Sequence, residues 1–332
     1  MFFVETKSVN AAFHFSTEEF LMQRFGLGPV IMLWQADKCV MLGANQVALA
    51  EVNMSFAQQE KINIVRRSSG GGAIFTDMGT LLYTMIQPYQ KESAVMQIAK
   101  ETIVGSVIGV LNKMGVPAVL EGRNDILANG KKFSGIAQYV RHDMLCTHGS
   151  LLYDTDLEML TNVLNVDDEK IHSKAIRSVR SRVTNIKDYM GLSTGNFIEL
   201  LKTELISLNK AQPYVLTSSE LNEIEKICKE KYENTDWTFG KSPAFSFSNS
   251  KRFPDGKIEV YLDIKKGVVT SCAIRGDFLG VAPIRALEEK LENISFQYEA
   301  FVKVLDEVSL SSFIGDITKE QLLLCIFENG VQ

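Results

Sequence analysis

Short apolar runs of strand length alternate with stretches of helical periodicity along the first two thirds of the chain. The apolar runs lie at residues 30–34, 39–42, 62–65, 81–86, 125–127 and 150–153. The turn-like segment 36–38 joins the first two runs, which predicts a hairpin. Strands and helices alternate without the regularity of βαβ units. We therefore expect an α+β fold, with a mixed, largely antiparallel sheet flanked by helices.

Amphipathic helices are predicted at three places by the spacing of apolar residues. The segments are residues 97–114, 196–208 and 218–232. Gly115 follows the first segment and ends it. Thr217 and Glu220 have the spacing of a capping box, which would start the third helix.

A stretch rich in Gly, Ser and Pro at residues 240–250 interrupts these patterns and predicts a domain boundary. Beyond it, the alternation over 258–264 predicts a strand with one buried face, and residues 265–267 lead into a second strand of a hairpin. Helical patterns follow at 283–291 and 319–327. We expect a large domain over residues 1–246 and a small α+β domain over residues 247–332.

Composition and charge exclude several classes of protein. The 332 residues carry 35 Lys and Arg against 40 Asp and Glu, so the net charge of −5 argues against a nucleic-acid-coating protein. Apolar runs stay far below the 18 or so residues that cross a membrane, and the first residues lack a signal-peptide pattern. Five scattered cysteines without a CxxC pair predict a reduced, cytoplasmic protein. The four histidines lack metal-ligand spacing, so a protein-held zinc or iron site is not expected.

The segment RRSSGGG at residues 66–72 is the first candidate for chemistry. Three consecutive glycines cost conformational entropy, and a folded protein keeps them where its backbone turns sharply or approaches a ligand. Two arginines and two hydroxyl groups beside exposed N–H groups suit an anion. The alternative is a hairpin turn with solvated arginines. The spacing fits neither a Walker A loop nor a dinucleotide-binding fingerprint.

A second candidate lies at residues 121–137. Asn129-Gly130 is a type I′ hairpin signal, which places Asp125 and Lys132 on adjacent paired strands. A carboxylate and an ammonium group would then share one site. The alternative is that Lys131 and Lys132 are ordinary surface lysines.

Two further segments contribute polar groups. His148 stands at the mouth of the apolar run of THGSLL at 147–152, either as a site residue or as a hydrogen-bonded structural histidine. The segment SVRSRVTN at 178–185 reads by itself as a solvated basic loop.

Together these segments resemble the lipoate-protein ligase family. The resemblance is carried, in sequence order, by RRSSGGG at 66–72, GRND at 122–125, KKFSGIA at 131–137, HGSLL at 148–152 and SVRSRVTN at 178–185. WTFGKSPAF at 237–245 resembles the junction to that family's C-terminal accessory domain. The resemblance implies the fold of biotin and lipoate ligases, which is related to class II synthetases, with residues 1–246 as catalytic domain and 247–332 as accessory domain.

The resemblance also implies a reaction. ATP and lipoate would form lipoyl-AMP and pyrophosphate, and a lysine of a lipoyl carrier domain would then displace AMP. ATP, Mg²⁺ and lipoate would be required, and the carriers would be E2 subunits of 2-oxoacid dehydrogenases or a glycine-cleavage H-type protein. A monomer acting without nucleic acid or membrane is expected.

Individual roles follow by matching each residue to the family's pattern. Lys132 would be the catalytic cation between the carboxylate and the α-phosphate, and Asp125 would order ATP or its metal. Phe75, Leu82 and Phe133 are guesses for an apolar tunnel that holds the acyl chain. The residues expected to bind lipoate or the adenylate are Arg67, Ser69, Gly70, Gly71, Gly72, Asn124, Asp125, His148, Gly149, Val179, Arg180, Arg182, Thr184 and Asn185.

The chain departs from the family pattern at two positions. Thr76 and Thr147 stand where the family usually has histidine, which leaves the preferred substrate open. Two alternatives therefore remain. One is a lipoyl or octanoyl transferase of the same fold with a cysteine nucleophile, for which Cys146 is a poor match because it follows Lys132. The other is a non-catalytic relative that binds lipoyl carriers. A biotin ligase is disfavoured because Gly122-Arg123 continues into Asn124-Asp125 rather than a GRGR stretch.

Overall fold

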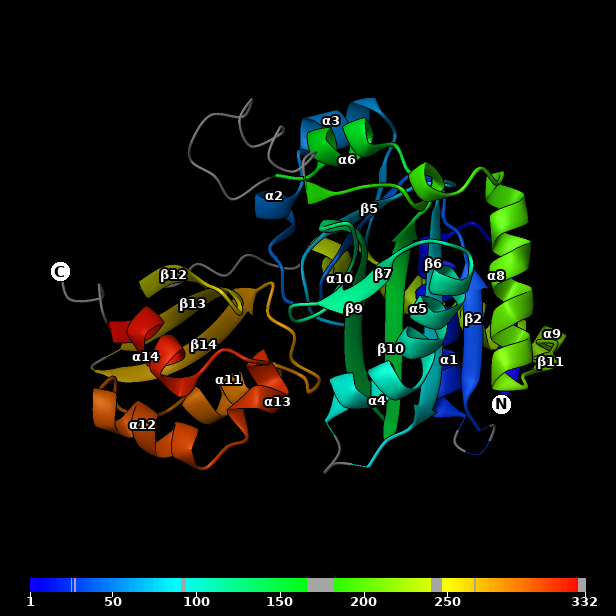
Figure 1. The fold of residues 1–332 in the computed structure, drawn as a ribbon. Coiled ribbons are helices and arrows are strands. Elements are labelled where there is room, and N and C mark those ends of the chain that lie inside the picture. Colours follow the sequence, from blue (N-terminus) through cyan, green and yellow to red (C-terminus); the bar gives the residue numbers. More distant parts are fainter. Residues whose placement is uncertain are drawn as a thin grey trace.

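A mixed sheet forms the centre of the larger domain (Figure 1). The structure is a computed structural model that describes residues 1–24, 26, 28–90, 94–165, 182–239, 247–265 and 267–327. Within these residues the sheet has eight strands, in the order β11 (Gln212–Tyr214), β1 (Phe2–Val4), β2 (Val30–Trp34), β6 (Thr80–Pro88), β10 (Met144–Leu152), β9 (Lys131–Arg141), β8 (Asp125–Ala128) and β7 (Ala118–Glu121). Strand β1 is parallel to β11 and β2, and the other neighbours are antiparallel. The predicted mixed, largely antiparallel sheet is confirmed.

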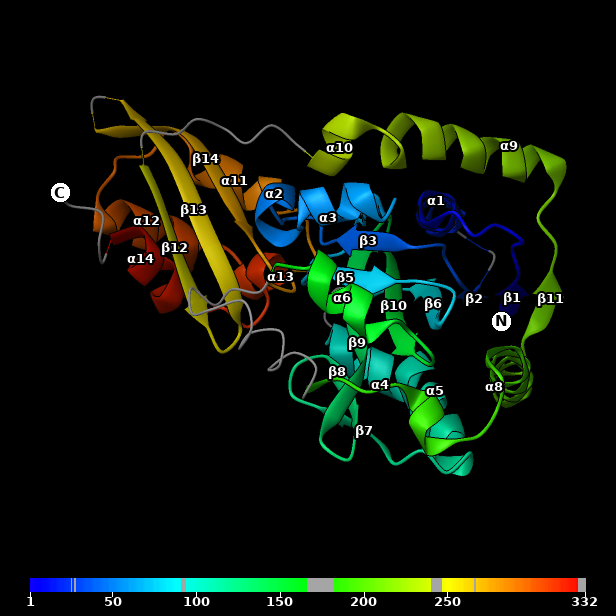
Figure 2. The same ribbon diagram turned by 90° about the horizontal axis from the view of Figure 1, so that it is seen from above.

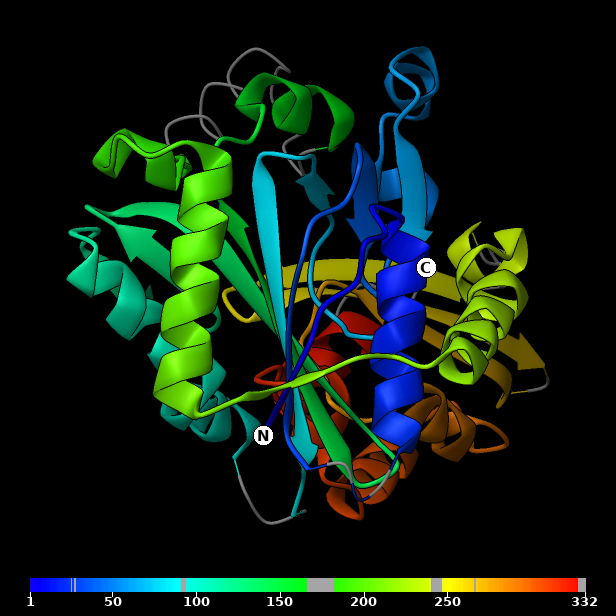
Figure 3. The same ribbon diagram turned by 90° about the vertical axis from the view of Figure 1, so that its right-hand side faces the viewer.

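Helices bury both faces of this sheet, which explains why several strands are continuous apolar runs. On β2, Ile31 packs into a core with α4 (Val95–Glu101), α5 (Ile103–Lys113) and α8 (Thr194–Asn209). Its neighbour Met32 packs into a core with α1 (Ala11–Gln23), α9 (Ser218–Ile227) and the π-helix η2 (Cys228–Tyr232). Figure 3 shows α8 and α1 with the sheet between them.

The predicted hairpin of residues 30–42 is wrong, although both strands exist. Strand β3 (Cys39–Leu42) joins a separate small sheet, where it pairs with β4 (Asn63–Arg66) and β5 (Ile74–Thr76). Both edges of β2 are already taken by β1 and β6, so β3 cannot pair with it. Short helices lie next to the small sheet in space or in the sequence, namely α2 (Ala48–Glu51), α3 (Met54–Gln59), α6 (Leu157–Val163) and α10 (Thr235–Phe239). The 3₁₀-helix η1 (Ile186–Tyr189) precedes α8.

Two predicted helices are interrupted. The segment 97–114 is split at Thr102 into α4 and α5, and an added Cβ on Gly105 would lie 2.2 Å from the Lys100 carbonyl oxygen, so the glycine permits this close approach. The segment 218–232 begins as an α-helix and widens into η2. Its capping box is confirmed, because the Glu220 N–H donates to Thr217 Oγ1 at 3.3 Å and the Thr217 N–H donates to Glu220 Oε2 at 2.8 Å.

The smaller domain is a three-stranded antiparallel sheet packed on helices. Its strands are β12 (Phe247–Phe253), β13 (Gly256–Lys265) and β14 (Val268–Gly276), and its helices are α11 (Arg285–Leu291), α12 (Tyr298–Asp306), α13 (Leu310–Ile314) and α14 (Lys319–Phe327). Pairing of β13 with β14 confirms the predicted hairpin. The boundary at 246/247 stays a prediction, because residues 240–246 lie outside the described residues.

The two domains lie side by side and meet through backbone hydrogen bonds (Figure 2). The Gly276 N–H donates to the Asn45 carbonyl at 2.9 Å, the Gly71 N–H to the Phe278 carbonyl at 3.1 Å and the Val140 N–H to the Val281 carbonyl at 3.0 Å. The segment after β14 is therefore docked against the triple glycine. None of the helices in the described residues combines the length and apolar character needed to cross a bilayer.

His14 on α1 generates a prediction about stability. The imidazole is buried, stacks on Trp34 with ring centroids 4.4 Å apart, and lies 2.9 Å from the Ser8 carbonyl oxygen. Burial lowers the pKa of His14 to about 4. Between pH 6.5 and 4 the unfolded chain binds more protons than the folded chain, so the free energy of unfolding falls as the pH falls.

From pH 7 to pH 5 this loss amounts to about 2 kcal/mol. Denaturant unfolding at the two pH values measures it, and His14→Gln should remove most of the difference. A variant that keeps the full pH difference would show that other groups cause it.

Candidate active site

Lys132 and Asp125 form an ion pair on the β8–β9 hairpin. Their turn residues Asn129 and Gly130 both have positive φ, at 49° and 75°, as a type I′ turn requires. Lys132 Nζ lies 2.7 Å from Asp125 Oδ1, and the two side chains are 41% and 36% exposed. The predicted adjacency is confirmed. An added Cβ on Gly135 would lie 3.4 Å from Lys132 Nζ, so the glycine leaves room for the ammonium group.

The end of the predicted adenylate loop lies beside this lysine. The Thr184 N–H donates to the Lys132 carbonyl at 2.9 Å, and Val183 forms a parallel bridge with Lys132. Asn185 fixes the segment because its amide both donates to the Thr155 carbonyl and accepts from the Thr155 N–H. Arg182 is exposed. Val179 and Arg180 lie outside the described residues.

The Arg67 side chain forms hydrogen bonds with the backbone of its own segment, residues 66–72, which we call the glycine loop. Its Nη1 donates to the Met41 carbonyl, and its Nη2 donates to the carbonyls of Gly70 and Gly72, each at 2.8 Å. Arg66 and Arg67 are each only 5% exposed, so the alternative of solvated arginines is wrong. Burial, and then the neighbouring charge of Arg66, lowers the pKa of Arg67 to about 10, which keeps it charged at neutral pH.

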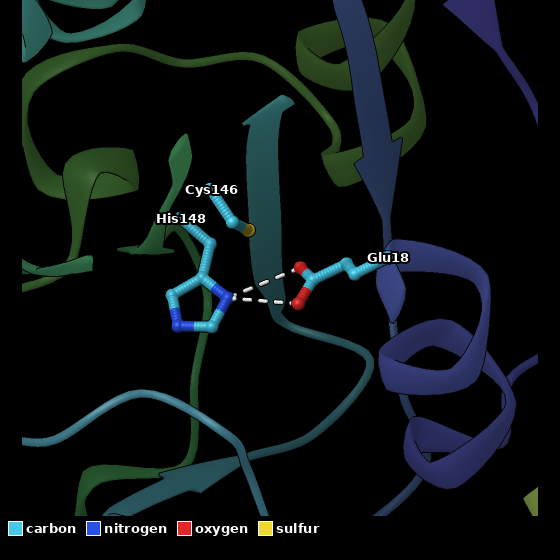
Figure 4. A group of neighbouring side chains, drawn as sticks. All are labelled: Glu18, Cys146 and His148. Carbon is cyan, nitrogen blue, oxygen red and sulfur yellow. Dashed lines mark hydrogen bonds and ion pairs between the residues drawn. The ribbon is translucent and has the colours of Figure 1, made fainter. Parts of the chain in front are cut away.

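A chain of buried polar groups leads from Arg67 to α1. Arg67 Nε donates to Ser69 Oγ at 3.0 Å, and Ser69 Oγ lies 2.7 Å from His148 Nε2. His148 Nδ1 lies 3.1 Å from both carboxylate oxygens of Glu18 (Figure 4). Thr84 Oγ1 donates to Glu18 Oε1 at 2.6 Å and accepts from Trp34 Nε1 at 3.1 Å. The carboxylate balances the charge of Arg67 inside the protein.

The thiol of Cys146 lies beside this chain (Figure 4). Ligand atoms of Glu18, Cys146 and His148 all lie within 4.8 Å of one another, a grouping that can hold a metal ion and that the sequence spacing did not reveal. Burial, and then the charge of Glu18, raises the pKa of Cys146 well above its usual range. The thiol is therefore protonated, and the imidazole nitrogens face Ser69 and Glu18. In this state the cluster is a hydrogen-bonded support for His148.

An apolar cavity of about 120 Å³ lies between the glycine loop and β10. Trp34 on β2 and Lys132 on β9 both line it, and these strands are three spacings apart, about 14 Å. The wall also includes Phe15, Met41, Arg67, Gly71, Gly72, Ala73, Ile74, Leu82, Asn124, Gly135, Ile136, Ala137, His148, Gly149 and Ser150. An acyl chain that runs from Trp34 to the Lys132 ammonium group would lie against a mainly apolar wall.

Of the three predicted tunnel residues, one lines this cavity and two do not. Leu82 lines it, whereas Phe133 packs in the core beneath α5 and Phe75 packs in the core of the small sheet. Phe133 follows Lys132 directly, and adjacent residues of a strand point to opposite faces. Sequence reasoning missed Phe15, Trp34 and Glu18, which come from segments with no motif of their own.

Gly70, Thr76 and Thr147 do not line this cavity. The two threonines are the positions at which the chain departs from the family pattern. Gly70 lines a different cavity, between the domains. Thr147 Oγ1 accepts from Gln138 Nε2 at 2.9 Å, and buried Thr76 Oγ1 has no hydrogen-bond partner among the described residues. Neither threonine is among the residues that line the apolar cavity between the glycine loop and β10.

Solved structures share this fold. The structure of P. falciparum LipL1 in complex with lipoate superposes with a TM-score of 0.76 at 19% identity and covers 93% of this chain and 94% of that one. A bipartite lipoate-protein ligase from Thermoplasma acidophilum, solved in a study that includes its E2 lipoyl domain, gives 0.65 at 26% identity and covers 74% and 98%. A lipoate-protein ligase A bound with ATP gives 0.62 at 25% identity and covers 72% and 98%.

Sequence comparison also finds lipoate-protein ligases, and these match nearly the whole chain. A probable lipoate-protein ligase A of Mycoplasma genitalium is 38% identical over 334 positions, covering 99% of both chains. The lipoate-protein ligase LplJ of Bacillus subtilis is 34% identical and covers 98% of this chain and all of that one. The family model of the lipoyl protein ligase A/B catalytic domain matches residues 10–206, and that of the bacterial lipoate protein ligase C-terminus matches residues 242–326. The chain therefore belongs to the lipoate-protein ligase family of enzymes.

Proposed function

We propose that this enzyme activates lipoate through lipoyl-AMP. The lipoate carboxylate attacks the α-phosphorus of ATP, an O–P bond forms, and pyrophosphate leaves with the electrons of the broken bond. Two anions meet in this step, so a fixed cation at their junction lowers its barrier. The observation that carries the proposal is the Lys132 ammonium group, which lines the apolar cavity and is held by Asp125.

The cavity supports lipoate as the acid. Its apolar wall suits a hydrocarbon chain and a dithiolane ring, because these groups have little polar surface that would need hydrogen bonds. We assign the acyl chain to the space between Trp34 and Lys132. Arg67, Ser69, Gly71, Gly72, His148 and Gly149 would fix the loop and the strand around it.

The nucleotide would lie at the outer side of Lys132, near Asn124, Asp125, Thr184 and Asn185. A relative with bound ATP supports this substrate. Mg²⁺ would come with ATP, and Asp125 would offer one carboxylate, which fits a cation held mainly by phosphate oxygens and water. When bound, the ion would neutralise the β- and γ-phosphates.

Domain displacement would accompany nucleotide binding. The Gly71 N–H is a suitable donor to a phosphate oxygen, but it donates to the Phe278 carbonyl. We infer that the segment after β14 leaves the loop before this donor can serve the substrate.

In the second step, the ε-amino group of a carrier lysine attacks the acyl carbon of lipoyl-AMP, the amide C–N bond forms, and AMP leaves. The amine must lose a proton, because only about one lysine in a thousand is neutral at pH 7.4. The structure of a relative studied with its E2 lipoyl domain supports a lipoyl carrier as partner. Exposed Arg182 could steer an acidic carrier. The carrier is tested by mass spectrometry of purified E2 and H-type domains after incubation with ATP and lipoate.

The five cysteines are unpaired and buried. Free thiols fit the cytoplasmic location expected from the sequence.

Lys132→Ala should leave the fold intact and lower the rate of adenylation by about 10² to 10³. The half-exposed Lys132–Asp125 pair adds little to stability, so unfolding should change little. Pyrophosphate release from ATP and lipoate, measured without carrier, gives the rate. Lys131→Ala, an exposed neighbour on the same strand, is the control. A near-normal rate for Lys132→Ala would remove the proposed role.

Cys146→Ser separates a ligase from a transferase. The thiol is fully buried and protonated, so a ligase should keep the ATP-dependent lipoylation rate to within about twofold once folding is verified. Cys39→Ser, another buried cysteine outside the site, is the matched control. Loss of acyl transfer in Cys146→Ser alone, at unchanged stability, would instead indicate a cysteine nucleophile.

A further inference from the structure

Two neighbouring carboxylates of α1 reach opposite sides of the glycine loop. Glu18 contacts His148, which lines the apolar cavity. Glu19 is only 5% exposed, and two side chains of η2 connect it to Ser68, a loop residue that does not line this cavity. The proposed reaction uses the first of these sides and leaves the second without a role.

Four polar groups form a closed ring of hydrogen bonds on this second side, and we call the set of Glu19, Ser68, Lys231 and Tyr232 the polar ring. Lys231 Nζ donates to Glu19 Oε2 at 2.6 Å and to Ser68 Oγ at 3.0 Å. Tyr232 OH donates to the same Glu19 oxygen at 2.9 Å and lies 2.7 Å from Ser68 Oγ. The Tyr232 hydroxyl has a single hydrogen, which Glu19 accepts, so Ser68 donates to Tyr232 and accepts from Lys231. The Ser68 side chain is therefore fixed by two partners.

Burial makes the bonds of the polar ring strong. Tyr232 is 1% exposed, and Lys231 Nζ lies 4.8 Å and 4.5 Å from the centres of the aromatic rings of Tyr232 and Trp237, within the range of a cation–π contact. Burial, and then the charge of Glu19, raises the pKa of Tyr232 well above its usual range, so its hydroxyl stays protonated. Hydrogen bonds with a charged partner in such a place are stronger than those in water.

The helix that supplies two members of the polar ring is wider than an α-helix at this point. The Glu233 N–H donates to the carbonyl of Cys228, five residues earlier, at 2.8 Å. Such π-helical turns are rare and occur frequently at functional sites. Directly after η2, Trp237 Nε1 in α10 donates to the Arg66 carbonyl at 2.9 Å. The stretch from η2 to α10 thus holds the glycine loop at two of its first three positions.

We propose that Lys231 is a positioning residue of the reaction, which fixes Ser68 and with it the glycine loop from the side opposite the apolar cavity. Gly71 and Gly72 of this loop line the cavity, and a glycine backbone loses much entropy when it is ordered. A loop that is ordered beforehand lowers the entropy lost when lipoate binds. This step rests on the proposal that lipoate lies in the apolar cavity.

The polar ring contributes most when the smaller domain leaves the loop. In the described arrangement the Phe278 carbonyl also holds the loop, through the Gly71 N–H. The proposed domain displacement breaks this bond, whereas all four members of the polar ring belong to the larger domain. The polar ring therefore keeps the loop in place after the contact with the smaller domain is lost.

Lys231→Met tests this role, since it removes the ammonium group and leaves Glu19 with its two other partners. We expect the dissociation constant of lipoate, measured by calorimetry without ATP, to rise about tenfold, the loss typical of one hydrogen bond from a charged group. Pyrophosphate release at saturating lipoate should stay within about threefold, because Lys132 lies on another element. Lys229→Met, a change of an exposed lysine in the same π-helix, should bind lipoate like the wild type.

A merely structural role would change other quantities. Partial unfolding of Lys231→Met would lower the rate and the calorimetric stoichiometry at an unchanged dissociation constant, and this result would overturn the proposal. Weaker lipoate binding in Lys231→Met, with no pyrophosphate release even in the wild type, would reject lipoyl-AMP but support the positioning role. Absence of lipoate binding to the wild type would reject both.

Ser68→Ala gives a second test if Lys231→Met does not fold. It removes the member of the polar ring that lies on the loop and keeps the Glu19–Lys231 pair, so lipoate should again bind about tenfold more weakly. In the double variant, Lys231→Met should add nothing to Ser68→Ala, because the bond that it removes is already lost. Unchanged binding in Ser68→Ala, or additive effects in the double variant, would contradict the role of Lys231.

Discussion

The buried charge of Arg67 is the constraint on which the reaction site depends. A guanidinium inside the protein must find hydrogen-bond acceptors, and here it finds the carbonyls of Met41, Gly70 and Gly72. Those bonds fix a backbone that three glycines would otherwise leave loose. Its counter-charge is Glu18, reached through Ser69 and His148. One electrostatic chain therefore joins α1, the glycine loop and β10, each of which contributes residues to the cavity wall.

Local features of the site could be predicted from the sequence, but its long-range contacts could not. The Asn129-Gly130 turn determines the register that brings Asp125 to Lys132, because the pair is separated by only a short hairpin. Glu18 lies 130 residues from His148, and no local pattern signals their contact. Phe75 and Phe133 lie outside the cavity for a related reason, because the face that a strand residue occupies depends on register rather than residue type.

The error over residues 30–42 has the same origin. Both apolar runs are strands, as their composition indicates, but a sequence does not show that β1 and β6 already occupy the edges of β2. Strand β3 consequently starts a second sheet, and β4 of that sheet leads directly into Arg66 and the glycine loop. The wrongly predicted hairpin is thus the departure that positions the loop beside the smaller domain.

Arg67 and Lys132 differ in exposure, and this difference fits the roles proposed for them. Arg67 is buried and bound by fixed carbonyls, so moving it would leave several acceptors unpaired. Lys132 is half-exposed, and its pairing with Asp125 contributes little to stability. An arriving carboxylate or phosphate can therefore compete for Lys132 at small cost, while Asp125 keeps the ammonium group oriented beforehand. In the proposed reaction, the rigid arginine shapes the loop and the lysine meets the substrate, because its pairing with Asp125 can be replaced by contacts with the reacting anions.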